Sequence, residues 1–202
     1  MHPIVFTEEI ERLLRTDPWI TALADLERLA QVLVGPSSDE WIRRGSSRAI
    51  INRSRFGSQA VKLKEELALL GTQAFAIRGE SSPDGPLRAA AFYHLKFEDS
   101  IHPLRDGNGR VGRTLLAAQC GKAYGVPIKE ILAEVADERN GYAMIYAPEA
   151  GEQKFELLLD VLSLILGVAV SNIALPFPLA AAYPDNGTFS SGKRLSDPAR
   201  TK

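Results

Sequence analysis

Residues 101–113 read IHPLRDGNGRVGR, and this stretch places a tight turn directly before a helix. The turn at Gly107–Gly109 carries little side-chain bulk, and the residues after it continue at helical spacing through Leu116. The free N–H groups at the start of a helix and the positive end of its dipole favour anions. The stretch therefore predicts a phosphate-binding turn that opens a helix from about residue 110 to residue 124.

Four charged or titratable side chains surround this turn. Arg110 and Arg113 are three residues apart and leave one face of the first helical turn, where they can neutralise a polyphosphate. Asp106 would be repelled by phosphates unless a divalent cation such as Mg²⁺ lay between them. His102 is the side chain most easily made a base near neutral pH. Together these residues predict a phosphate-transfer site.

Each of these residues also has a purely structural interpretation. His102 could be a structural histidine, Asp106 could cap the following helix, and the two arginines could form surface salt bridges. A capping role for Asp106 is compatible with metal binding. Because all four side chains surround one glycine turn, we favour the functional interpretation.

The stretch resembles the signature of the Fic family: a His, a hydrophobic residue two positions on, an acidic residue, Gly-Asn-Gly-Arg, two variable residues and Arg. The match holds at seven positions, which are His102, Asp106, Gly107, Asn108, Gly109, Arg110 and Arg113. With each residue type at a frequency of ~1/20, seven fixed positions match by chance about once in 10⁹ starting points. The resemblance is dense from about Ala89 to Tyr124, and Leu104 stands where most members have Phe.

This resemblance implies a mostly α, Fic-like helical domain that transfers AMP from ATP to a Ser, Thr or Tyr hydroxyl of a target protein. At the matching positions, His102 is the expected base and Asp106 the expected Mg²⁺ ligand. The expected cradle for the α and β phosphates is Gly107, Asn108 and Gly109. Arg110 is then the β-phosphate contact and Arg113 the γ-phosphate contact. Doc-type kinases of the same superfamily carry Lys where this chain has Gly109, which favours nucleotidyl transfer over phosphorylation.

Two features that are common in the family are not clearly present in this sequence. Members usually carry a β-hairpin flap that holds the target segment by strand addition, and the candidate in this chain is Ala74–Arg78 with its following turn. Many members also carry an inhibitory helix in which Ser or Thr is followed, after three residues, by Glu and then Gly or Asn. No Glu in this chain precedes Gly or Asn; Thr7 and Glu11 have the spacing, but Arg12 follows. We therefore expect restraint by a separate antitoxin-like inhibitor, or none.

Outside the motif, apolar residues recur mostly at helical spacing. The first helix is expected from Asp17-Pro18 to about Leu33, and further helices over 59–70, 87–100, 128–139 and 155–170. Only Ala74–Arg78 has the pattern of a strand. The sequence predicts one mostly α domain over residues 1–182, followed by a flexible tail over residues 183–202.

The amino-acid composition and the distribution of charge indicate which classes of partner and which compartment to expect. The 202 residues are 45% hydrophobic and 24% charged, which is ordinary for a globular protein, and 24 Lys and Arg nearly balance 25 Asp and Glu. The chain therefore has no net positive charge that would favour binding to nucleic acid. The single cysteine, Cys120, and the absence of an apolar run near the N-terminus favour the cytoplasm. Residues 161–184 carry no charge. We interpret them as a buried helix followed by an apolar docking segment at a homo-oligomer interface, rather than as a membrane contact.

Two other functions stay open on the same residues. One is a catalytically silent nucleotide-binding module, for which Leu104 and the short flap would be signs of decay. The other is a different phosphate-linked transfer on the same scaffold, such as removal of AMP or phosphorylation. The target protein cannot be identified from the sequence, because flap contacts select it.

Overall fold

The computed structural model describes residues 7–35, 41–42, 49–51, 54–56, 59–136, 145 and 153–170. Its helices are α1 (Glu8–Thr16), α2 (Leu23–Val34), α3 (Leu63–Arg78), α4 (Gly85–Leu95), α5 (Asn108–Tyr124), α6 (Ile128–Ala136) and α7 (Lys154–Leu166). A 3-10 turn, η1 (Ala60–Lys62), precedes α3, and a π-helical segment, η2 (Lys96–Ile101), follows α4. Two short strands, β1 (Ala49–Ile51) and β2 (Ser54–Phe56), pair antiparallel. The mostly α prediction is confirmed.

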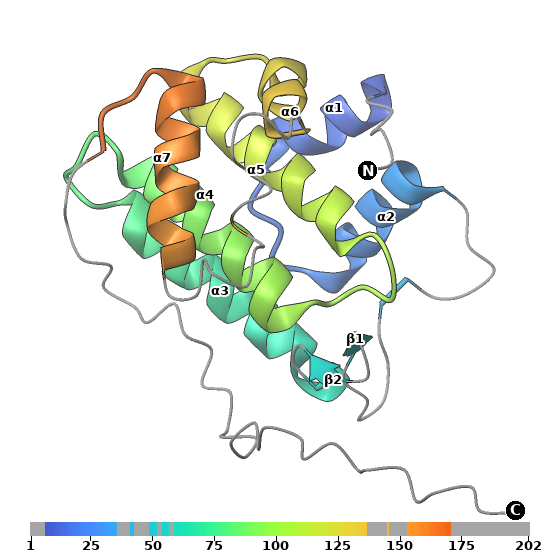
Figure 1. Cartoon of the computed structure of the whole chain (residues 1–202). Helices are drawn as coiled ribbons and strands as arrows, with labels where there is room; N and C mark the ends of the chain where they lie inside the picture. Colours follow the sequence, from blue (N-terminus) through green and yellow to red (C-terminus); the bar gives the residue numbers. More distant parts are fainter. Residues whose placement is uncertain are drawn as a thin grey trace, which may run out of the picture.

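Helices α4 and α5 form the interior of the bundle (Figure 1). All residues from Leu87 to Leu95 are buried in α4, and all residues from Val111 to Gly121 are buried in α5. Helices α3 and α7 pack against α4, whereas α1, α2 and α6 pack against α5. A helix that is covered on every side belongs to a core. The segment that links α4 to α5 therefore has both of its ends anchored in the core, and this segment carries the motif.

The predicted strand at Ala74–Arg78 is wrong, because these residues form the last turns of α3. The buried positions of α3 include Leu67, Leu70, Ala74 and Ile77, which recur at steps of three and four residues. This helical period extends the helix predicted over 59–70 through the supposed strand. The chain does contain a short hairpin, but it is formed by β1 and β2, further upstream.

The helix predicted from Pro18 is also misplaced, because the helix begins at Leu23. The preceding segment is fixed by hydrogen bonds from the core. The Tyr93 hydroxyl donates to the carbonyl of Ile20 (2.5 Å), and the Gln119 side-chain amide donates to the carbonyl of Pro18 (3.1 Å). A helix starting at Pro18 would use these carbonyls within itself, so tertiary contacts override the local start signal.

The other helix boundaries lie closer to the predicted ones. The helix predicted over 87–100 is present as α4 and η2, and the last predicted helix ends at Leu166. Residues 137–139 of another predicted helix, and the predicted tail over 183–202, lie outside the described residues. Among the described residues, none of the helices has the length and apolar character needed to cross a bilayer.

Acid should destabilise the protein through His94, which is buried in α4 and whose pKa is lowered by that burial to about 4. Between about pH 6.5 and pH 4 the unfolded chain binds a proton at this residue and the native state does not, so the free energy of unfolding falls as pH falls. The loss by about pH 4 should be on the order of 3 kcal/mol. Urea unfolding from pH 7 to pH 4 measures it, with His94→Gln as the non-titrating control. Equal pH dependence in both proteins would contradict this origin.

Candidate active site

The motif begins where η2 ends, at a sharp change of chain direction. His102 has φ +48°, in the left-handed region, and is the non-glycine residue with positive φ among the described residues. Its backbone N–H donates to the carbonyl of Phe97 (2.8 Å), which closes the last π turn. A residue that carries a β-carbon has a strained backbone in the left-handed region. Turns of π-helix often occur at functional sites. The strained backbone of His102 and the π turn before it both mark this residue as a candidate functional residue.

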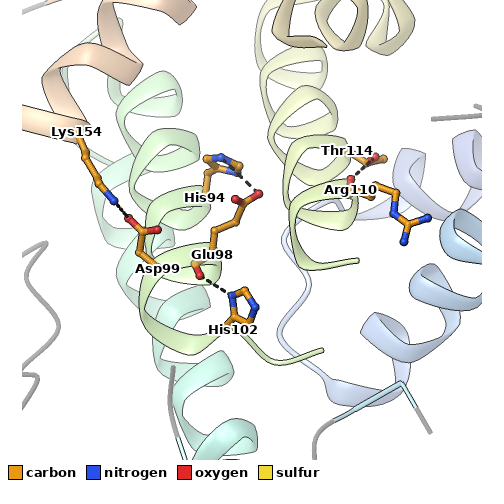
Figure 2. Close-up of polar contacts among 7 residues, drawn as sticks. All are labelled: His94, Glu98, Asp99, His102, Arg110, Thr114 and Lys154. Atoms are coloured by element: carbon orange, nitrogen blue, oxygen red, sulfur yellow. Dashed lines mark hydrogen bonds and ion pairs between the residues drawn. The ribbon is translucent and has the colours of Figure 1, made fainter. Parts of the chain in front are cut away.

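A hydrogen bond to the backbone orients the ring of His102. Its Nδ1 lies 2.9 Å from the backbone carbonyl oxygen of Glu98 (Figure 2). A carbonyl oxygen can only accept, so Nδ1 carries the proton in the neutral ring. The lone pair is therefore on Nε2, which is the arrangement that a general base requires.

Asn108 shapes the loop with its side chain. Its Oδ1 accepts from the Leu104 N–H (2.9 Å), and its Nδ2 donates to the Leu104 carbonyl (2.8 Å). Leu104 is fully buried, and its N–H and C=O have no access to water. The Asn108 amide thus satisfies both backbone groups of one buried residue. Asn108 can contribute to a phosphate cradle with its backbone, while its side chain holds the loop closed.

The acidic residue of the motif lies at the mouth of the site. Asp106 Oδ1 accepts from the Gly107 N–H (2.7 Å), and Oδ2 pairs with Arg110 Nη2 (3.1 Å). Its side chain is 77% exposed. The described residues hold no group of three or more His, Cys, Asp or Glu side chains that could bind a metal. A single exposed carboxylate suits Mg²⁺ that is shared with substrate phosphates and keeps its waters, rather than a resident metal ion.

The two arginines of the motif have different environments. The Arg110 side chain is largely covered and pairs with Asp106. Arg113 is buried, and its Nε has no hydrogen-bond partner among the described residues. A β-carbon added at Gly109 would lie 3.3 Å from Arg113 Nη1, so the guanidinium packs against the bare backbone of the turn. An unpaired buried guanidinium N–H is costly, and an anion bound at this turn would satisfy it.

A pocket of about 330 Å³ opens at this turn, and all seven predicted site residues line it. An eighth residue, Arg105, also lines the pocket; its position is variable in the family signature, so the motif gave no signal for it. Three arginines and one aspartate make the lining cationic. The pocket therefore suits a polyphosphate, with His102 at its edge.

One comparison with known proteins places this site in a family. The model of the Fic/DOC family matches residues 19–120, which extends well upstream of the dense resemblance. The chain belongs to the Fic/DOC family. No curated protein and no solved structure matches the chain. The matched range includes every residue of the Fic motif, and family membership indicates transferase activity in general.

Removing the Asn108 side chain should destabilise the loop between η2 and α5. Asn108→Ala leaves the buried N–H and C=O of Leu104 unpaired, at a cost of about 2–4 kcal/mol. Asn108→Asp keeps the acceptor but places a buried carboxylate oxygen against the Leu104 carbonyl, so its loss should be at least as large. Urea unfolding of the three proteins measures the difference. Wild-type stability in Asn108→Ala would show that water or a rearranged loop replaces both hydrogen bonds.

Proposed function

We propose that this Fic protein is a protein adenylyltransferase that moves AMP from ATP to a Ser, Thr or Tyr hydroxyl of a target protein. One observation carries the proposal: a histidine with its lone pair on Nε2 and a helix start with an unpaired buried guanidinium line the same cationic pocket. A hydroxyl acceptor needs the first and a polyphosphate donor needs the second.

His102 acts on the acceptor. Its Nε2 takes the proton from the target hydroxyl while the hydroxyl oxygen attacks the α-phosphorus of ATP. The bond between the α-phosphorus and the oxygen that bridges to the β-phosphorus breaks, and diphosphate leaves. The Glu98 carbonyl, 2.9 Å from Nδ1, stabilises the imidazolium that forms. The products are an AMP ester on the target and diphosphate.

The first turn of α5 acts on the donor. Its N–H groups, Arg110 and Arg113 bind the phosphates, and Asp106 is the residue that would hold Mg²⁺. When bound, Mg²⁺ offsets phosphate charge as the diphosphate leaves. Gly109 supports nucleotidyl transfer over phosphorylation, because the Lys of Doc-type kinases would start from a β-carbon 3.3 Å from Arg113 Nη1 and crowd that guanidinium.

Two observations favour an active enzyme over a silent binding module. Leu104 is fully buried and held by Asn108, so the loop keeps an apolar plug where most members have Phe. A hairpin is also present upstream of the motif, in β1 and β2. Both observations support an active enzyme.

We extend the proposal to two protein partners, a hydroxyl-bearing target and a separate inhibitor. Glu11, the internal candidate for inhibition, pairs with Arg15 on the exposed face of α1 (2.8 Å). It is thus engaged away from Arg113. A separate protein that places a Glu beside Arg113 would suppress transfer by displacing the γ-phosphate.

Wild-type protein incubated with cell lysate and Mg²⁺ should transfer label from α-labelled ATP to protein, and should add no label from γ-labelled ATP beyond what the lysate incorporates without it. His102→Ala should slow this transfer by about 10²–10⁴-fold and bind ATP with near wild-type affinity, because the base contacts the acceptor and not the phosphates. Label from γ-labelled ATP alone would indicate phosphorylation. Nucleotide binding with no transfer from either label would indicate the silent module.

Arg113→Ala should remove the preference for ATP over ADP. Losing a charge-assisted contact with the γ-phosphate costs about 1.5–3 kcal/mol, or roughly ten- to a hundredfold in ATP affinity, and leaves ADP affinity nearly unchanged. Calorimetric titration with both nucleotides measures this. Arg12→Ala is the matched control, because it removes one exposed arginine of α1 that does not line the pocket and should leave both affinities unchanged. An equal loss of ATP and ADP affinity in Arg113→Ala would assign Arg113 to the loop's structure.

A further inference from the structure

Glu98 is a buried acidic residue in η2 that the family motif does not include. It lies four residues before His102, and it is 8% exposed. Its backbone carbonyl accepts from His102 Nδ1, whereas its side chain extends toward α5 (Figure 2). One residue thus faces both halves of the candidate site: the base and the helix that carries the arginines.

The Glu98 side chain lies against the backbone of α5 at Gly112. A β-carbon added at Gly112 would be 2.9 Å from Glu98 Cγ and 3.0 Å from Glu98 Cδ, and closer still to Oε1. Real β-carbons essentially never approach another atom this closely. A β-carbon at Gly109 would also lie 4.0 Å from the same oxygen. The carboxylate therefore occupies a gap that exists because α5 has glycine at position 112, whereas the distance at Gly109 is an ordinary van der Waals contact.

Neighbouring contacts fix η2 from both sides. His94 Nε2 lies 3.7 Å from Glu98 Oε1, and the His94 ring also hydrogen-bonds to the backbone of Gly112. On the opposite side, Asp99 Oδ2 pairs with Lys154 Nζ of α7 (2.8 Å), as Figure 2 shows. The π turns are thus held between α5 and α7, and the Glu98 side chain is the spacer on the α5 side.

We propose that Glu98 is a positioning residue for the transfer reaction. Its side chain sets the distance between η2 and α5 at Gly112, and its carbonyl fixes the Nδ1–H tautomer of His102, so that the base and the arginine-bearing helix keep one relative arrangement. The inference rests on the proposed function in taking His102 as the base. Glu98 contacts neither substrate in this scheme and acts through His102 and α5.

The first test removes the spacer. Glu98→Ala creates no clash and should lower kcat for AMP transfer about tenfold or more, with KM for ATP within about threefold, because the phosphate contacts remain. Glu98→Gln keeps the size of the side chain and should restore kcat to within about threefold of wild type. Wild-type kcat in Glu98→Ala would overturn the proposal, and so would a loss confined to KM.

The second test closes the gap from the other side. Gly112→Ala should push the carboxylate away and lower kcat in the same way. In the double variant Glu98→Ala/Gly112→Ala the new methyl group meets no carboxylate, so kcat should be no lower than in Glu98→Ala alone. If the two losses multiply instead, the residues act independently and the proposal fails. Gly71→Ala is the matched control: its β-carbon would collide with the Thr21 side chain, in the segment before α2, so it should lower stability and leave kcat unchanged.

A readout that needs no activity is the tautomer of His102, given by the ¹⁵N chemical shifts of its two ring nitrogens. The wild type should show the Nδ1–H form, and Glu98→Ala and Gly112→Ala should each show a mixture. An unchanged tautomer in both variants would overturn the inference. If the wild type transfers no AMP but the tautomer responds as expected, the proposed function fails and the positioning role of Glu98 stands.

Discussion

The reversal of the chain between η2 and α5 is the constraint on which the rest of the site depends. The left-handed backbone of His102 carries strain of about 1–3 kcal/mol. The bond from its N–H to Phe97, the bond from its ring to Glu98 and the two bonds between Asn108 and Leu104 offset that strain. Without them the chain would relax, and the His102 ring would lose its direction relative to the first turn of α5.

The site divides into a rigid part and an exposed part. Asn108 and Arg113 are buried on α5, an interior helix, so they share the low mobility of the core. Asp106 lies at the open mouth of the pocket and pairs with Arg110 and the adjacent backbone. This division suits the proposed transfer, in which His102 and Arg113 stay fixed while nucleotide, Mg²⁺ and target arrive and leave.

Sequence reasoning succeeded where the signal is local and failed where it is tertiary. The start of α5 was predicted within two residues, because a glycine turn followed by helical spacing is local information. Ala74–Arg78 was misread because a short apolar run fits a strand as well as a buried helix. The roles of Asn108 and Glu98 could not be predicted in this way. They depend on which backbone groups lie beside each side chain, and only the folded chain determines that.

Gly109 and Gly112 of α5 lower the intrinsic stability of the helix, but the site requires the space that they leave. Each glycine in a helix costs about 1 kcal/mol relative to alanine. At Gly109 a side chain would crowd Arg113, and at Gly112 it would displace Glu98. The bare backbone thus does three things at once: it exposes N–H groups to phosphate, leaves room for the guanidinium and admits the carboxylate that separates η2 from α5. A stronger helix former at either position would stabilise the isolated helix and disturb the arrangement that gives the site its chemistry.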